Sequence, residues 1–293
     1  MDKIKGFKIR EFKEHNYRAI FNEITGQTIR IALDPKLSIG SLEHPELLDV
    51  SFGTKCLANC SFCYTSAIKN GVNYPNLVNK IVNWFGSLTT NQRPFQVAIG
   101  GGGEPTLHPE FIDAIKTFSY LDIMPNYTTN AMHLSKEVVE ATKEYCGGVA
   151  ISCHPHLDKV WKKGIQILTD AKIRTNLHII VGEPGSAQRF FDIYNEFNGL
   201  VEYFVLLPYQ SAGRAKSIET ESEWEFLFDK LLESKPKNIA FGALFYPFIM
   251  KHKDKYKNFD ISLYEPEVMS GYLMMDEEMY IRKSSYDLRP KHE

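Results

Sequence analysis

The sequence predicts an α/β protein built as a partial (β/α)6 barrel of the TIM-like type, with an N-terminal hairpin extension and a small C-terminal β cap. From about residue 47 onward, short runs rich in β-branched and aromatic residues alternate with stretches whose apolar residues recur at helical spacing. Repeated strand–helix units imply a parallel sheet with helices outside it, and about six units can curl into a partial barrel. Glycines and polar residues gather just after the strand candidates, where α/β barrels build their active sites.

The individual elements follow from local patterns. Residues 17–21 and 28–33 flank Thr25-Gly26 and predict a hairpin ahead of the main domain. The strand candidates of the barrel are 47–52, 95–99, 122–127, 148–152, 175–181 and 203–207, with 239–241 as a seventh. Helical spacing is clearest around Gly164, Phe190 and Phe228. We therefore expect an N-terminal extension over 1–45, a catalytic core over 46–235 and a C-terminal cap over 236–293.

Composition and charge exclude several classes of protein. The 293 residues are 43% apolar and 24% charged, as in a globular protein with one large core. The formal net charge of -2 provides no basic field for long nucleic acid or an anionic membrane. The apolar stretches fall short of the roughly 20 residues of a membrane span, and the first residues lack the apolar core of a signal peptide. We expect a cytoplasmic protein with reduced cysteines.

Three of the five cysteines, Cys56, Cys60 and Cys63, lie within eight residues as CxxxCxxC. A loop with this spacing can hold three irons of a cuboidal cluster and leave the fourth iron without a protein ligand. The odd count and the expected compartment disfavour disulfides, and a structural zinc site would require a fourth Cys or His. A non-catalytic iron–sulfur or zinc protein, acting as a redox sensor or an assembly module, is the alternative to an enzyme.

With Phe62 before its last cysteine, the motif resembles the CxxxCxΦC signature of the radical S-adenosylmethionine (SAM) superfamily, in which Φ is aromatic. The resemblance implies a [4Fe-4S] cluster held by Cys56, Cys60 and Cys63, with SAM chelating the open iron. It also implies an enzyme that cleaves SAM reductively and abstracts hydrogen with a 5′-deoxyadenosyl radical. An external electron donor such as flavodoxin or ferredoxin would reduce the cluster, and Phe62 would border the adenine.

Four further segments resemble SAM-binding motifs of the superfamily. The first three follow the second, third and fourth strand candidates, and the fourth is similar to a strand-six segment that ends in Gly-Arg-Ala. They depart from the family pattern in Ala131, where Gly is usual, and in Cys153-His154-Pro155 after Ser152. The residues that the resemblance assigns to SAM are Gly102, Gly103, Glu104, Thr129, Asn130, Ser152 and Arg214. Glu104 would face the SAM amino group, since a buried carboxylate needs a partner.

Catalytic candidates lie at the ends of later strands. Cys153 could donate a hydrogen atom, and His154 or His156 could position an anion or move a proton. Tyr209 and Glu183 are candidates of the same kind. A Cys at a strand end is also a common small core residue, and loop histidines often only bond backbone. His178, in the middle of a strand candidate, is interpreted as a core histidine.

The C-terminal stretch 268–285 has the pattern of a strand, an acidic turn and a strand, and it resembles SPASM or twitch domains without their cysteines. No cysteine follows Cys153, so we expect one cluster and a cap made of polypeptide alone. The substrate class stays open between a small molecule, a nucleoside and a peptide, because substrate contacts lie in variable loops. A pyridoxal-phosphate enzyme is not favoured, since no Lys stands out as a Schiff-base former.

Overall fold

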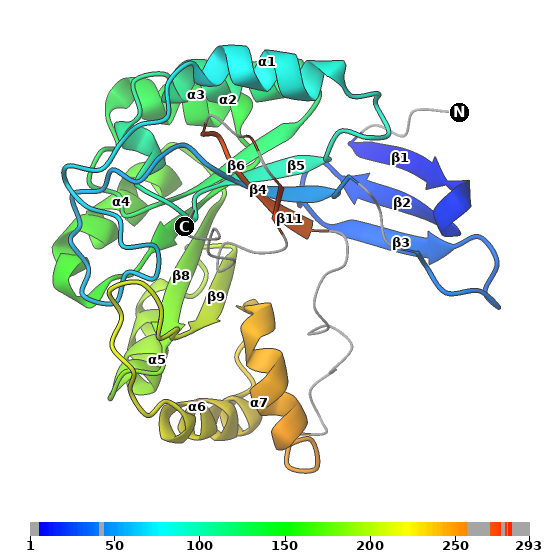
Figure 1. Ribbon diagram of the computed structural model, residues 1–293. Helices are drawn as coiled ribbons and strands as arrows, with labels where there is room; N and C mark the ends of the chain where they lie inside the picture. The colour runs from blue at the N-terminus through cyan, green and yellow to red at the C-terminus, as the bar shows by residue number, and fades with distance from the viewer. Residues whose placement is uncertain (1–5, 41–43, 257–269, 277–278, 280, 283–293) are drawn as a thin grey trace, which may run out of the picture.

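The computed structural model describes residues 6–40, 44–256, 270–276, 279 and 281–282 (Figure 1). Its main sheet has the order β10-β9-β8-β7-β6-β5-β4-β11-β12, in which the strands from β10 to β11 are parallel and β12 is antiparallel to β11. The barrel strands are β4 (Leu47–Ser51), β5 (Gln96–Ile99), β6 (Met124–Thr129), β7 (Gly148–Ser152), β8 (Thr175–Val181), β9 (Tyr203–Pro208) and β10 (Ile239–Phe241). The helices are α1 (Leu77–Ser87), α2 (Phe111–Tyr120), α3 (Lys136–Tyr145), α4 (Asp158–Asp170), α5 (Ser186–Phe197), α6 (Glu221–Ser234) and α7 (Tyr246–Lys251).

The predicted partial barrel is confirmed. Strands β4 to β9 are neighbours in chain order, a helix follows each of them, and no closed barrel forms among the residues described. The third strand, β6, begins two residues later than the predicted 122–127, because Asp122 lies in a turn with φ of 63°. No helix in the described part of the chain combines the length and hydropathy that a bilayer crossing requires.

Alternation along the strands separates an inner face from a helix-covered face. In β8, Leu177 and Ile179 are fully buried while Asn176 and His178 are half-buried. The buried positions face the helices, as shown by the ring of Phe204 in β9, which lies 4.9 Å from that of Tyr194 in α5. Because side chains alternate across a strand, Asn176 and His178 point to the inner face of the sheet.

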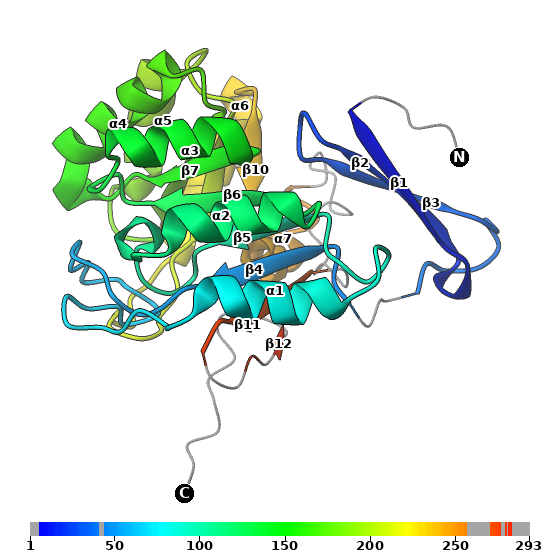
Figure 2. The ribbon, with the colours of Figure 1, turned by 90° about the horizontal axis from the view of Figure 1, so that it is seen from above.

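The N-terminal extension forms a separate sheet of β1 (Phe7–Phe12), β2 (Tyr17–Asn22) and β3 (Thr28–Ala32). The expected hairpin is β2–β3, and β1 adds an antiparallel strand to it. Phe21 stacks on Phe95 at 5.2 Å, and the Gln96 amide donates to the Gly26 carbonyl at 3.1 Å. This sheet therefore packs at the amino ends of the barrel strands, opposite the loop that follows β4 (Figure 2).

The C-terminal strands β11 (Ser270–Met274) and β12 (Ile281–Arg282) pair as the predicted antiparallel strands. Strand β11 also continues the main sheet, because it pairs in parallel with β4 along its whole length. Lys80 of α1 donates to the Met275 carbonyl at 2.8 Å. Residues 277–278 of the expected acidic turn lie outside the described residues. The C-terminal region is thus joined directly to the strand that precedes the cysteines.

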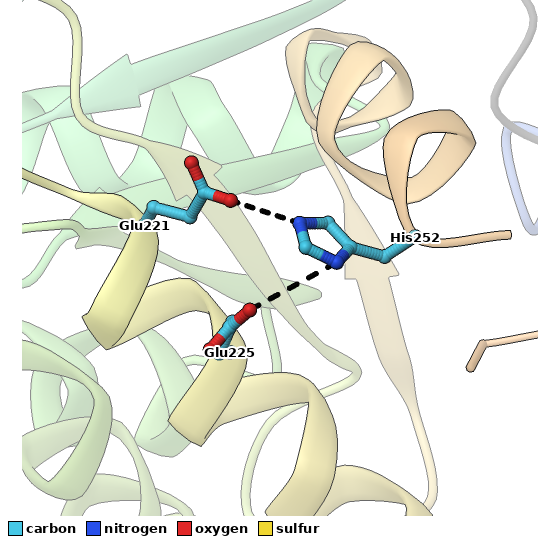
Figure 3. Close-up of side chains that lie close together, drawn as sticks. All are labelled: Glu221, Glu225 and His252. Carbon is cyan, nitrogen blue, oxygen red and sulfur yellow. Dashed lines mark hydrogen bonds and ion pairs between the residues drawn. The ribbon is translucent and has the colours of Figure 1, made fainter.

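Helix α7 is held against the first turn of α6 by a charged cluster (Figure 3). His252, just after α7, bonds Glu221 at 2.9 Å through Nε2 and lies 3.8 Å from Glu225 through Nδ1. Lys251 also donates to both oxygens of Glu221. This cluster supplements the aromatic contact between the two helices, in which the rings of Phe228 and Phe248 lie 5.5 Å apart.

Packing around Ala131 predicts opposite effects for two glycine substitutions in helices. A Cβ at Gly164 in α4 would lie 2.4 Å from the Ala131 Cβ, whereas a Cβ at Gly86 in α1 would meet no atom within 4 Å. Gly164→Ala should lower the free energy of unfolding by about 1–3 kcal/mol through overpacking. Gly86→Ala should raise it by up to about 1 kcal/mol through helix propensity. Urea unfolding measures both changes.

The double variant Gly164→Ala, Ala131→Gly tests the cause. Ala131 has a φ of 64°, which glycine adopts without strain, and its removal also clears the clash. Stability should therefore return toward the wild-type value. A double variant no more stable than Gly164→Ala alone would show that the contact with Ala131 is not responsible.

Candidate functional site

The cysteine loop leaves β4 and is closed by its own backbone. Thr54 N donates to the Val72 carbonyl at 2.8 Å, and Cys56 N donates to the Ile68 carbonyl at 2.9 Å. Cys60 is buried, whereas Cys56 and Cys63 are half-buried. The loop thus presents three thiols close together at the carboxyl end of the sheet.

The spacing of the sulfurs does not suit a single metal ion. Tetrahedral thiolates on zinc, with Zn–S of about 2.3 Å, lie about 3.8 Å apart. Within the described residues, the His, Cys, Asp or Glu side chains whose ligand atoms all lie within 4.8 Å of one another form a single group of three. That group consists of Glu221, Glu225 and His252 and contains no cysteine. At least one pair of the three sulfurs is therefore farther apart than 4.8 Å, as expected when each thiolate binds a different iron.

The glycine loop after β5 lies against the backbone of the cysteine loop. Gly103 N donates to the Gly53 carbonyl at 2.6 Å, and Glu104 N donates to the Lys55 carbonyl at 2.8 Å. A Cβ at Gly103 would lie 2.3 Å from the Lys55 carbonyl oxygen, and one at Gly102 would lie 2.4 Å from that of Gly53. Only glycine permits this approach, which places Glu104 beside the thiols.

Glu104 is a buried carboxylate at the centre of a hydrogen-bond network. Its Oε1 accepts from the hydroxyls of Thr106 and Thr129, both at 2.7 Å, and its Oε2 accepts from Asn130 N at 2.8 Å. Burial raises the pKa of this carboxyl, and the hydrogen bonds from Asn130, Thr106 and Thr129 oppose that change. No cationic side chain of the described residues forms an ion pair with it. A cationic amino group would complete this site.

Asn130 joins the carboxylate to the thiols. Its backbone N–H bonds Glu104, while its side-chain Nδ2 donates to the Cys56 sulfur at 3.6 Å. Ala58 N also donates to Cys56 at 3.5 Å, and the Thr65 hydroxyl lies 3.4 Å from the Cys63 sulfur. Donors from several segments of the chain are therefore aimed at the sulfurs.

The thiols repel one another as thiolates. The pKa of Cys60 is raised to about 12 by burial and by the neighbouring charges of Cys56 and Cys63. Burial likewise raises the pKa of Cys56, with a further contribution from Glu104. Three thiolates can exist together here only beside a positively charged metal centre. The residues therefore fit an iron–sulfur cluster.

Arg214 has different partners from the predicted SAM groups. Its Nε and Nη2 donate to the Cys60 carbonyl at 3.2 and 3.0 Å, and its Nη1 donates to the Ala67 carbonyl at 2.6 Å. The preceding Gly213 has a φ of 60°, and a Cβ there would lie 2.3 Å from the Tyr64 carbonyl oxygen. In this geometry, Arg214 holds the cysteine loop by its backbone.

Two histidines and Phe62 form an aromatic group beside the cysteines. The ring of Phe62 lies 5.2 Å from His154 and 6.1 Å from His156, and the two imidazoles are nearly parallel. The pKa of His154 is lowered to about 4, mainly by burial and also by His156, Arg189 and His178. His154 is therefore neutral at pH 7, which suits hydrogen bonding more than binding of an anion.

The remaining predicted residues lie in different surroundings. Cys153 is buried in the core with its sulfur 3.7 Å from the Ile151 carbonyl, and burial raises its pKa, so its position is that of a core residue. The Tyr209 hydroxyl donates to the Lys216 carbonyl at 3.0 Å. Ser152 lies on the inner face beside His178, and burial lowers the pKa of His178 to about 4.

Thr65 and Thr106 were not identified from the sequence. The Thr65 hydroxyl also donates to the Gly102 carbonyl at 3.1 Å and so connects the two loops. Thr106 supplies two donors to Glu104, one from its hydroxyl and one from its backbone. A hydroxyl two residues after a ligand or an acid is a weak local signal for such bonds.

Comparisons with known proteins agree with this geometry. Residues 50–189 match the family model of the radical SAM superfamily. Streptococcus suis SuiB bound to its precursor peptide SuiA is similar with a TM-score of 0.67 and 13% identity, over 93% of this chain and 81% of that one. SuiB bound to S-adenosylmethionine is similar with a TM-score of 0.66 and 14% identity, over 93% of this chain and 80% of that one. The structure of anSMEcpe with bound AdoMet is similar with a TM-score of 0.56 and 12% identity, over 84% of this chain and 79% of that one.

At these identities the solved structures share the fold with this chain. Among curated proteins, no sequence matches.

The raised pKa of Glu104 predicts a pH-dependent stability. Below the ordinary carboxyl pKa of 4.5, the raised pKa of Glu104 contributes its full share to the free energy of unfolding. This contribution is lost as the pH rises through the pKa that Glu104 has in the folded protein. Relative to Glu104→Gln, the wild type should thus lose stability above pH 4.5, by about 1.4 kcal/mol per unit of raised pKa. Urea unfolding at several pH values measures the difference.

Glu137→Gln provides the control, since hydrogen bonds donated by its own backbone N–H and by the Ser135 hydroxyl lower the pKa of this exposed carboxyl. Its pH dependence should have the opposite sign, with stability lost as the pH falls below 4.5. An advantage of wild type over Glu104→Gln that is constant or grows with pH would contradict the burial of an uncompensated carboxylate.

Arg214→Lys should loosen the cysteine loop while keeping the charge. A lysine cannot donate to two carbonyls with a planar fork, so one of the Cys60 and Ala67 bonds is lost. Amide hydrogen exchange between residues 56 and 68 should become about tenfold faster for each 1.4 kcal/mol lost. Lys216→Arg is the control, and equal exchange in all three proteins would contradict the role of Arg214.

Proposed function

The chain carries a radical SAM domain over residues 50–189, and we propose that it cleaves S-adenosylmethionine reductively to abstract a hydrogen atom from a neutral substrate. When bound, a [4Fe-4S] cluster supplies the electron that breaks SAM into methionine and a 5′-deoxyadenosyl radical. One observation carries the proposal: Asn130 connects Cys56, one of the three cysteines of the motif, to a buried carboxylate that has no cationic side-chain partner among the described residues. A non-catalytic metal protein has no use for that second site.

Cys56, Cys60 and Cys63 would hold the cluster, one iron each. The amide of Asn130 and the N–H of Ala58 would stabilise the thiolate charge of Cys56. Arg214 would keep the loop in its binding conformation through the carbonyl of Cys60. An external one-electron donor such as flavodoxin or ferredoxin would reduce the cluster.

Glu104 would bind the amino group of SAM and remain ionised in doing so. Phe62 would lie against the adenine, with His154 packed on the edge of its ring. Thr129 and Asn130 would orient Glu104 by their hydrogen bonds, and Ser152 would contact SAM from the end of β7. Apart from Phe62, which belongs to the cysteine loop, these side chains follow strands other than β4.

A neutral substrate fits the inner face of strands β6 to β9. The inward positions there carry no Lys, Arg, Asp or Glu; they are Met124, Asn126, Thr128, Gly148, Ala150, Ser152, Asn176, His178, Ile180, Tyr203, Val205 and Leu207. The Oδ1 of Asn176, near the amino end of β8, is buried and has no hydrogen-bond partner in the described structure. An uncharged amide-bearing molecule is favoured over a phosphorylated one.

A peptide is the first substrate class to test. The similar SuiB structure is bound to its precursor peptide, and a peptide backbone carries no charge, in keeping with the uncharged inner face. A nucleoside is the next class, since it also carries uncharged donors and acceptors.

Iron content and SAM cleavage test the proposal. The anaerobically purified and reconstituted chain should hold about four irons and four sulfides, and after reduction it should convert SAM to 5′-deoxyadenosine. Cys60→Ala should abolish both the product and most of the iron. Cys146→Ala is the matched control, because Cys146 lies at the end of α3 away from the loop, and it should behave as wild type.

One zinc per chain, or equal product from wild type and Cys60→Ala, would refute the proposal. If the wild type cleaves SAM as expected, its substrate can be sought by incubating the reduced enzyme with deuterated peptides and nucleosides. Deuterium should appear in 5′-deoxyadenosine only with the correct class.

A further inference from the structure

We propose that His156 is a positioning residue that raises the reduction potential of the cluster, by donating its Nε2–H to the sulfur of Cys60. The inference rests on the proposed function, since it requires the cluster at the three cysteines. It assigns a role to the part of the chain that departs most from the family pattern, Ser152-Cys153-His154-Pro155-His156.

The hydrogen on Nε2 is determined by a second contact. The Nε2 of His156 lies 2.9 Å from the Ala58 carbonyl oxygen, which can only accept a hydrogen bond. Nε2 must therefore carry the proton. The same nitrogen lies 3.7 Å from the Cys60 sulfur. One N–H is thus shared between a carbonyl and the thiolate, as in a three-centre hydrogen bond.

The segment that carries His156 is anchored independently of the cysteine loop. Arg189 of α5 donates to the Cys153 carbonyl at 2.8 Å and to Asp158 at 2.7 Å. The Trp161 indole donates to the His154 carbonyl at 3.2 Å. These bonds hold two backbone carbonyls before His156 and the side chain of Asp158 after it. Its contact with Cys60, 96 residues away in sequence, is therefore set by the tertiary structure.

The bond distinguishes Cys60 from the other two ligands. Cys56 receives the Asn130 amide and a backbone N–H, and the Thr65 hydroxyl lies next to Cys63. The side-chain donor that the described residues offer to Cys60 is the imidazole of His156. Cys60 and Cys56 thus receive side-chain donors of different kinds, an imidazole and an amide.

The sign of the effect follows from charge. Reduction adds an electron to the cluster and increases the negative charge on its sulfurs. An N–H donor stabilises this reduced state more than the oxidised one, so it raises the potential. Removing the donor should make the cluster harder to reduce. Because His156 itself is exposed, its replacement leaves the core intact.

Redox titrations of the reconstituted protein, followed by electron paramagnetic resonance, test the inference. At a fixed solution potential, His156→Ala should give about a tenfold lower ratio of reduced to oxidised cluster. This corresponds to a reduction potential lowered by about 59 mV for a one-electron couple. His156→Gln retains an N–H at a similar position and should stay near wild type. His154→Gln is the matched control in the same segment, because within the described structure the His154 imidazole packs against Phe62 and bonds no cysteine sulfur.

The outcomes separate this inference from the proposed function. An unchanged potential in His156→Ala at full iron content, or equal shifts in His156→Ala and His156→Gln, would overturn the role of His156 alone. Failure of the wild type to bind about four irons would overturn both. An intact cluster with a His156-dependent potential but no SAM cleavage would overturn the proposed function and leave this inference standing.

A spectroscopic measurement on the wild type covers the case in which His156→Ala loses iron. With ¹⁵N-labelled histidine, the reduced cluster should show a hyperfine coupling to one ring nitrogen, transmitted through the N–H···S bond. The coupling should vanish in His156→Gln, which carries no labelled nitrogen. Absence of the coupling in the wild type would overturn the inference.

Discussion

The contact between the glycine loop and the cysteine loop is the constraint on which the rest of the site depends. Two backbone hydrogen bonds, from Gly103 to Gly53 and from Glu104 to Lys55, bring the ends of β4 and β5 together. Glycine at 102 and 103 leaves space for that approach. Once the loops meet, Glu104 lies within reach of Asn130 from β6, and Asn130 reaches Cys56. Three neighbouring strands thus contribute to one site.

Electrostatics makes this site costly for the polypeptide alone. Burial raises the pKa of Glu104 and of the Cys56 and Cys60 thiols, so each negative charge is disfavoured in the folded chain. Hydrogen bonds from Thr129 and Asn130 recover part of that cost. Positive charge from a metal centre and from an amino group would recover the rest. Residues arranged against local stability in this way are typical of functional sites.

Support for the cysteine loop comes from far along the chain. Arg214 follows β9, yet its three nitrogens donate to carbonyls within the loop. Strand β11 pairs with β4 just before the loop begins. The N-terminal sheet packs at the opposite ends of the strands and leaves the site free. The core is therefore stabilised from both ends of the chain, and the N-terminal sheet lies away from its carboxyl edge.

The sequence by itself determined the alternation of strands and helices, the cysteine motif and the acid after the glycines, because these are local patterns of period, spacing and composition. It could not decide the partners of Arg214 or the donor to Cys60. Arg214 lies 154 residues from Cys60 in the sequence, and His156 lies 96 residues from it. It also left Cys153 open between a reactive thiol and a core residue. In the tertiary structure Cys153, just after β7, is buried in the hydrophobic core on the side that Val149 and Ile151 also face. Local chemistry names the candidates, and only packing determines which atoms meet.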